Sequence, residues 1–143
     1  MRLLHWCTDQ AMTAALGEMD LTASQGHIMG FLARREQPPC PRDIEEAFGM
    51  SHPTVSGLLS RLEKKGFIEF RSDETDRRIK RIHILPKGRE CLDLMHQTIR
   101  QTETRMVQDF TPEEQDQFAA LLTRAIRNMG GNHCHRHKEE PKT

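Results

Sequence analysis

Apolar residues along this chain recur mainly every three or four positions, the spacing of amphipathic helices. The pattern predicts a helix over residues 3–18 and a second that opens at the capping box Thr22-Ala23-Ser24-Gln25. The proline-rich run 37–41 ends the second helix, because proline cannot donate the backbone hydrogen bond that a helix requires. Pro41 suits the first turn of a third helix, which ends at Gly49. Its inward-facing side chains are expected to be Ile44, Ala47 and Phe48.

The pattern then changes from a fourth helix to two strands. The helix runs from Ser51, the candidate N-cap, to Lys65, and its spacing turns one face inward. That face consists of Val55, Leu58, Leu59 and Leu62. Residues 67–71 and 79–85 read as strands on either side of a polar tip. A helix, a turn, a second helix and a charged ribbon form, in this order, a helix-turn-helix with a β wing.

After Gly88 the apolar positions alternate between steps of three and four, as in a coiled-coil seam. Thr111-Pro112-Glu113-Glu114 is a second capping box and opens a last helix. The first stripe consists of Leu92, Met95 and Ile99, then Thr102, Met106 and Phe110, and the second consists of Phe118, Leu121, Leu122, Ala125, Ile126 and Met129. One small lobe cannot easily hide both stripes, so we expect a homodimer. The predicted fold class is mainly α with a small β wing (α+β).

Composition narrows the class of protein without naming a reaction. No apolar run approaches the ~20 residues that span a bilayer, so no membrane partner is expected and a cytoplasmic location is favoured. The four cysteines lie far apart and are interpreted as idle thiols. The sequence has no nucleophile–base pair, phosphate-cradling loop or catalytic metal signature, so the protein is not expected to be an enzyme, and no cofactor is implied.

The formal net charge of zero hides a basic stretch around the fourth helix and the ribbon. Close approach to a major groove requires short side chains at the start of a recognition helix, and arginines suit phosphates or a guanine edge. The residues that meet these demands and are predicted to contact DNA are Ser51, His52, Thr54, Ser56, Gly57, Ser60, Arg61, Lys64, Arg71, Arg77, Arg78 and Lys80. The alternative is a winged-helix module that binds another protein.

Several short motifs carry a resemblance to a known family. They are Asp20-Leu21-Thr22 with Gln25, Asp43-Ile44, Ser51-His52-Pro53-Thr54-Val55-Ser56, Leu62-Glu63-Lys64-Lys65-Gly66-Phe67-Ile68, Asp76-Arg77-Arg78 and Pro86-Lys87-Gly88. In these motifs the chain resembles the MarR family of bacterial transcription regulators, which are winged-helix dimers and mostly repressors that respond to small molecules. The family usually has threonine where Leu85 stands, so the N-cap of the long helix is expected to be weaker or to come from elsewhere.

The resemblance implies a separate role for each successive segment of the chain. Arg78 would enter the minor groove at the wing tip, and Asp76 would hold its guanidinium. The partner would be double-stranded DNA with a pseudo-palindromic operator. The implied parts are a dimerisation helix (1–20), the winged helix-turn-helix domain (21–88), the C-terminal dimerisation helices (89–130) and a polar tail expected to be disordered (131–143).

Three interpretations stay open for the signal that would release the protein from DNA. The first is a small aromatic effector, as in similar proteins, bound between the two lobes by His5, Trp6, Met29 and Phe31. The second is oxidant sensing by Cys7, which lies in the first helix as in peroxide-sensing relatives but lacks the tyrosines that steady the thiol there. The third is metal binding by the tail, where the weak candidates are His133, Cys134, His135 and His137.

Overall fold

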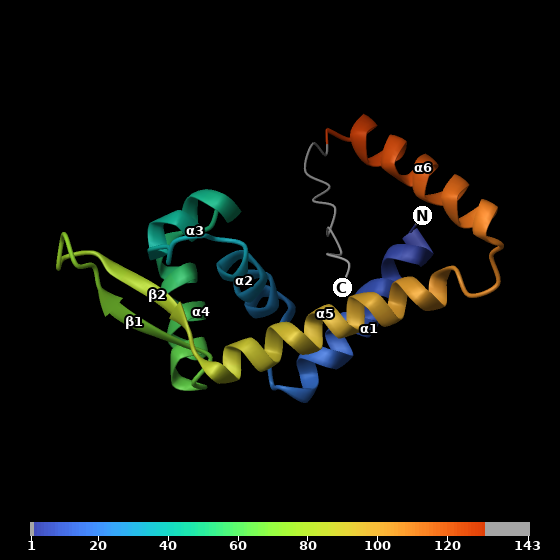
Figure 1. Ribbon diagram of the computed structural model, residues 1–143. Coiled ribbons are helices and arrows are strands. Elements are labelled where there is room, and N and C mark those ends of the chain that lie inside the picture. Colours follow the sequence, from blue (N-terminus) through green and yellow to red (C-terminus); the bar gives the residue numbers. More distant parts are fainter. Residues whose placement is uncertain (1, 131–143) are drawn as a thin grey trace, which may run out of the picture. The chain divides into compact units, whose positions relative to one another are not determined.

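The computed structural model describes residues 2–130, and these residues form six helices and a two-stranded antiparallel sheet (Figure 1). The elements are α1 (Arg2–Glu18), α2 (Ala23–Ala33), α3 (Pro41–Phe48), α4 (His52–Lys64), β1 (Ile68–Ser72), β2 (Lys80–Ile84), α5 (Pro86–Met106) and α6 (Pro112–Asn128). This order confirms the predicted fold class. The chain divides into two compact units between Glu103 and Thr104. Within residues 2–130, no helix is long and apolar enough to cross a membrane.

Local side-chain caps set the ends of several helices. The predicted capping box at α2 is confirmed, since the Gln25 backbone N–H donates to Thr22 Oγ1 at 3.3 Å and the Thr22 N–H donates to Gln25 Oε1 at 3.0 Å. The box at Thr111 and Glu114 is present in the same form. Asp43 caps α3 by accepting the Cys40 N–H at 2.7 Å, and this hydrogen bond holds the pKa of Asp43 below its usual range.

One apolar core joins α1 to α5 in the first unit. Its buried members are Leu16, Leu21, Ile28, Met29, Leu32, Ile44, Val55, Leu59, Leu62, Phe67, Ile68, Ile82, Cys91 and Leu92. Two predicted core positions are wrong in degree: Ala47 is exposed and Leu58 is only half-buried. Both lie at the edge of their helix's apolar stripe, beyond the side chains that the core buries.

The wing is fastened to the helices through backbone hydrogen bonds. The strands pair in the register Ile68 with Ile84 to Ser72 with Lys80, and each begins one residue later than predicted. The Ile82 N–H donates to the carbonyl of Pro39 at 2.8 Å, so the connection between α2 and α3 lies against β2. Leu85 donates to the carbonyl of Phe67 at 3.0 Å and brings the start of α5 to the start of β1. The position of the wing relative to α4 is thereby fixed on both strands.

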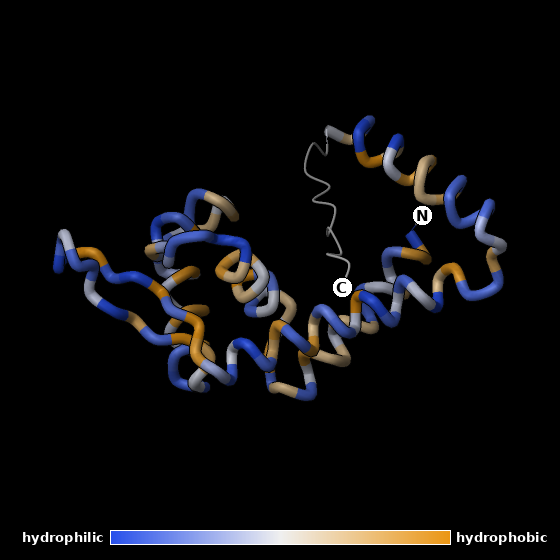
Figure 2. Tube along the Cα trace, in the orientation of Figure 1, coloured by the Kyte–Doolittle hydropathy of each residue, from blue (hydrophilic) through white to orange (hydrophobic). Residues whose placement is uncertain are grey.

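The second unit contains the amphipathic helix α6. Hydrophobic and hydrophilic residues alternate along it (Figure 2), and none of its residues is buried. Leu121 is 60% exposed and Met129 is 87% exposed, while Phe118 packs edge-on against Phe110 with ring centroids 5.7 Å apart. The predicted apolar stripe is therefore largely uncovered in the described chain. The predicted disorder of residues 131–143 lies outside the described residues.

Candidate nucleic-acid interface

The turn between α3 and α4 determines how α4 begins. Gly49 adopts the left-handed conformation (φ 62°) that ends α3, and its N–H donates to the carbonyl of Glu45. Ser51 follows as the extended N-cap of α4, as predicted. Its side chain does not cap the helix, however, because its Oγ lies 2.9 Å from Thr54 Oγ1 instead. Both hydroxyls remain exposed at the start of the helix.

His52, the first residue of α4, is held by a carboxylate from α3. His52 Nδ1 lies 2.6 Å from Glu45 Oε1, and the two side chains are 74% and 23% exposed. The backbone carbonyl of Glu45 also accepts the Met50 N–H at 3.2 Å. Glu45 thus contacts the turn through its backbone and α4 through its side chain. The sequence prediction missed Glu45, because the contact joins two helices across a turn and the periodicity of a single helix cannot predict it.

The predicted short-chained face of α4 is open to solvent over its first two turns. Thr54, Ser56 and Gly57 are exposed, and a Cβ placed on Gly57 would meet nothing within 4 Å. Ser60 is half-buried and lines a shallow pocket of about 240 Å³ with Ser56, Glu63 and residues of α3 and β1. This face therefore lets another molecule approach the helix backbone closely.

A cationic segment continues the same helix. Arg61 and Lys64 are exposed in its last turns, and neither side chain contacts a carboxylate in the part of the chain that the structure describes. Other basic residues differ from these two. Arg42, for example, pairs with Glu46 at 3.0 Å, and Lys65 pairs with Asp20 at 2.9 Å. Two cations on α4 are thus left available for an external anion.

Asp73 organises the wing tip. Its Oδ1 accepts the Thr75 hydroxyl at 2.6 Å and the backbone N–H groups of Thr75 and Asp76 at 2.9 and 3.1 Å. Its Oδ2 accepts Arg81 Nε at 2.7 Å. These hydrogen bonds, with that of the Thr75 hydroxyl the strongest, hold the pKa of Asp73 far below its usual range. Arg81 is consequently a structural residue of the wing.

The expected bracing of Arg78 by Asp76 is wrong in its geometry. Asp76 Oδ1 accepts the backbone N–H of Arg78 at 3.0 Å, and the described residues offer the guanidinium no carboxylate. Because the turn is short, the Asp76 carboxylate lies beside the backbone N–H of Arg78 and not beside its guanidinium. Arg77 and Arg78 are both exposed at the tip, and neither side chain is paired within residues 2–130.

The other two predicted ribbon contacts are partly engaged. Lys80 Nζ donates to Ser72 Oγ at 2.8 Å across the strands, and Arg71 forms an ion pair with Glu69. Both side chains are exposed, so these contacts leave them at the surface.

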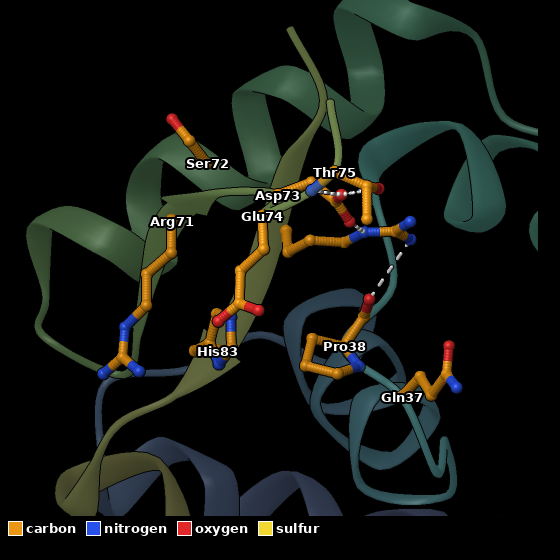
Figure 3. Close-up of a pocket in the computed structure, with 9 residues that line it drawn as sticks. Gln37, Pro38, Arg71, Ser72, Asp73, Glu74, Thr75 and His83 are labelled. Atoms are coloured by element: carbon orange, nitrogen blue, oxygen red, sulfur yellow. Dashed lines mark hydrogen bonds and ion pairs between the residues drawn. The ribbon is translucent and has the colours of Figure 1, made fainter. Parts of the chain in front are cut away.

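A polar pocket of about 620 Å³ opens between the wing and the turn after α2 (Figure 3). Asp73 and Thr75 lie on one side of it, and Gln37 and Pro38 lie on the other. Arg81, which also lines the pocket, is already bound to Asp73 and donates to the Pro38 carbonyl at 3.4 Å. The pocket shares no residue with the predicted effector site.

The structure does not bring the four predicted effector residues together as one site. Met29 is fully buried in the core, and Phe31 packs edge-on against Phe48 with ring centroids 5.5 Å apart. His5 and Trp6 lie near the start of α1 and are exposed, Trp6 by 58%. Phe31 is half-buried, so Met29 is the only one of the four whose side chain is fully enclosed by the core.

Cysteine and metal chemistry have little geometric support within the described residues. Cys7 is exposed on α1, and Cys91 is buried, which raises the pKa of its thiol. No group of three or more His, Cys, Asp or Glu residues in positions 2–130 could hold a metal ion. The weak metal candidates His133, Cys134, His135 and His137 lie outside the described residues.

Together, α3, α4 and the β1–β2 ribbon define a winged helix-turn-helix protein. Comparison with known proteins narrows this class. Residues 19–79 match the sequence model of the MarR family. YwaE, an uncharacterized HTH-type transcriptional regulator of Bacillus subtilis, is 30% identical over 88 residues, which make up 62% of this chain and 52% of that protein. The match thus spans about half the length of this relative.

Solved structures match a larger share of the chain. MepR of Staphylococcus aureus in complex with DNA has 29% identity and a TM-score of 0.78 over 90% of this chain and 96% of its own. MepR, a transcription regulator of the multidrug efflux pump MepA, also has 29% identity and a TM-score of 0.78 in another crystal structure, with 90% and 94% of the chains covered. Residues 19–79 therefore carry the sequence pattern of the MarR family, and 90% of the chain shares the fold of MepR.

Proposed function

We propose that this protein is a sequence-specific DNA-binding transcriptional regulator that acts as a homodimer in the cytoplasm. The observation that carries the proposal is the set of exposed cations without a carboxylate partner in the described chain: Arg61 and Lys64 on α4, and Arg77 and Arg78 on the wing. DNA phosphates are anions that exposed, unpaired lysines and arginines bind. The solved complex of MepR with DNA shows that a protein of this fold binds a duplex.

Each element has a separate role in the proposed complex. The first turns of α4 enter the major groove, where Thr54, Ser56 and Gly57 permit close approach. Arg61 and Lys64 neutralise phosphates along the groove. Arg78 extends from the wing tip into the neighbouring minor groove, with its main chain held by Asp76. Base contacts would therefore come mainly from α4, and the wing would set the register.

The dimer is proposed because the apolar residues of α6 and of the first turns of α1 lie uncovered. Leu121 and Leu122 on α6 are 60% and 44% exposed, Met129 directly after α6 is 87% exposed, and Leu3 on α1 is 73% exposed. Burial of apolar area drives association in water. A two-fold dimer would present two copies of α4 to half-sites about one helical turn, ~34–36 Å, apart.

Repression with release by a small aromatic molecule is the proposed mode of regulation. Trp6 offers an exposed ring on α1, next to the exposed His5. A ligand that bound dimers with one distance between the two α4 helices less well than dimers with another distance would shift the population toward the second form. The test is operator affinity in the presence of a panel of aromatic compounds, with Trp6→Ala as the variant expected to lose the response.

The DNA claim is tested by a gel shift with DNA from upstream of the protein's own gene, at several stated salt concentrations. We expect a shift that unrelated duplex does not compete away. Arg78→Ala should weaken binding and reduce the slope of log K against log salt, because the proposed dimer loses two cations that approach the DNA, one from each wing. Equal affinity for every duplex, together with an Arg78→Ala variant that binds like the wild type, would overturn the proposal.

A further inference from the structure

We infer that Glu45 is a specificity-determining residue that acts through His52, fixing its ring so that Nε2 can accept a hydrogen bond from a base-edge amino group. The inference rests on the proposed DNA-binding function and adds to it a residue outside the DNA-facing helix. It starts from one contact: His52 Nδ1 and Glu45 Oε1 are 2.6 Å apart across the turn between α3 and α4.

The direction of this hydrogen bond follows from the chemistry of the two groups. An ionised carboxylate can only accept, so the hydrogen lies on Nδ1 and the ring donates it. In the neutral ring the second nitrogen, Nε2, then carries no hydrogen and is an acceptor. The hydrogen-bond donors in the major groove are the amino groups of adenine and cytosine, so these are the groups that an acceptor can bind there. Glu45 would therefore decide what kind of base edge His52 can read.

The surroundings show why the ring needs a support. His52 is the first residue of α4, and its side chain is 74% exposed. Such a side chain samples several rotamers when nothing holds it, and ordering it on binding costs free energy. Glu45 is less exposed, at 23%, and its carbonyl accepts the Gly49 and Met50 N–H groups. The carboxylate thus comes from a fixed point of the turn.

Simple electrostatics makes the opposite prediction, which gives the test its power. Removing a carboxylate near the DNA should strengthen binding, because it removes repulsion from the phosphates. If Glu45 positions His52, Glu45→Ala should instead weaken operator binding by about tenfold, the equivalent of ~1.4 kcal/mol. Glu46→Ala is the matched control on the same helix, since Glu46 pairs with Arg42 at the surface and, within residues 2–130, forms no ion pair with α4. This control should bind at least as tightly as the wild type.

The decisive experiment is a double-mutant cycle on operator affinity with Glu45→Ala, His52→Ala and the double variant. We expect the double variant to bind no more weakly than His52→Ala alone, and the base preference to flatten at the same operator position in all three. Glu45→Gln retains an acceptor oxygen and should keep both the affinity and the preference. Thermal melting of each variant checks that the fold is unchanged.

The outcomes separate this inference from the proposed function. Additive losses in the cycle, or Glu45→Ala binding more tightly than the wild type, would overturn the role of Glu45 while wild-type operator binding stands. If Glu45→Ala does not fold, a Glu45→Gln variant as weak as His52→Ala would overturn it in the same way. A wild-type protein without operator preference would instead overturn the proposed function itself.

Discussion

Gly88→Ala should destabilise the protein although alanine is the better helix former. Gly88 is buried in the first turn of α5. A Cβ at this position would run into the carbonyl oxygen of Phe67, and would lie 2.7 Å from Ile84 Cγ2 and 3.0 Å from Met29 Cε. The first of these is backbone and cannot rotate away, so α5 would have to move from the start of β1. The glycine is therefore required by close packing between the long helix and the wing.

The size of the effect follows from two opposing terms. Overpacking a well-filled core costs ~1–3 kcal/mol, and a contact with backbone favours the upper end. Replacing glycine by alanine within a helix returns ~1 kcal/mol. The net loss should be roughly 2 kcal/mol in the free energy of unfolding.

The assay is equilibrium urea unfolding at one fixed protein concentration, because association would otherwise shift the midpoint. Gly17→Ala is the matched control, since Gly17 is exposed in α1 and a Cβ there would meet nothing within 4 Å. This control should be neutral or slightly more stable. A Gly88→Ala variant as stable as the control would refute the reasoning.

Three further predictions concern the wing, the recognition helix and the thiols. Asp73→Asn should lower the melting temperature at pH 7. The difference from the wild type should shrink as the pH falls below ~4, because the depressed pKa of Asp73 stabilises the fold only while the carboxylate is ionised. A difference that grows toward acid pH would contradict this role of Asp73. Gly57→Leu should keep the melting temperature within a few degrees, since the position is open in the free protein. It should lower operator affinity at least about tenfold, since the proposed complex brings this position too close to the groove for a large side chain. Unchanged affinity in a gel shift would count against this placement of α4. Iodoacetamide should modify Cys7 well before Cys91, whose burial raises its pKa, and similar rates in peptide mapping would contradict the structure.

Features encoded within a few residues were predictable from the sequence. The capping boxes at Thr22 and Thr111 depend on side chains that bond to their own turn, and both are present. The end of α3 at Gly49 depends on the left-handed backbone that glycine adopts readily, and it is present too. The inward face of α4 was also predicted, apart from the half-buried Leu58. Here the helical period fixes the buried face but does not fix how far burial extends to either side of it.

Contacts between distant residues were not predictable in the same way. The polar tip of the wing contains Asp73, Glu74 and Asp76, and the sequence does not say which carboxylate accepts which arginine. In the strand register Arg81 lies opposite Arg71, and its side chain donates to Asp73, two residues further on. The tight turn directs Asp76 to the backbone of Arg78. The shape of the turn between α3 and α4 decides the pairing of Glu45 with His52 for the same reason.

The predicted effector residues show a related limit. The resemblance to similar proteins makes Met29 a candidate pocket residue, but it lies in the same helix as Ile28 and Leu32 and is buried with them. A large flexible apolar side chain serves a core and a ligand pocket equally well. Only the packing around it decides between the two.

The central claim, that two copies of α4 read a palindromic site, is tested most directly by hydroxyl-radical footprinting of the upstream DNA. The account predicts two protected segments per strand on one face of the duplex, with centres about 10–10.5 base pairs apart or a multiple of this distance. Arg78→Ala should lose the protection that flanks each segment, where the wing tip meets the minor groove. Uniform protection along the fragment, or a single unpaired segment, would contradict the account.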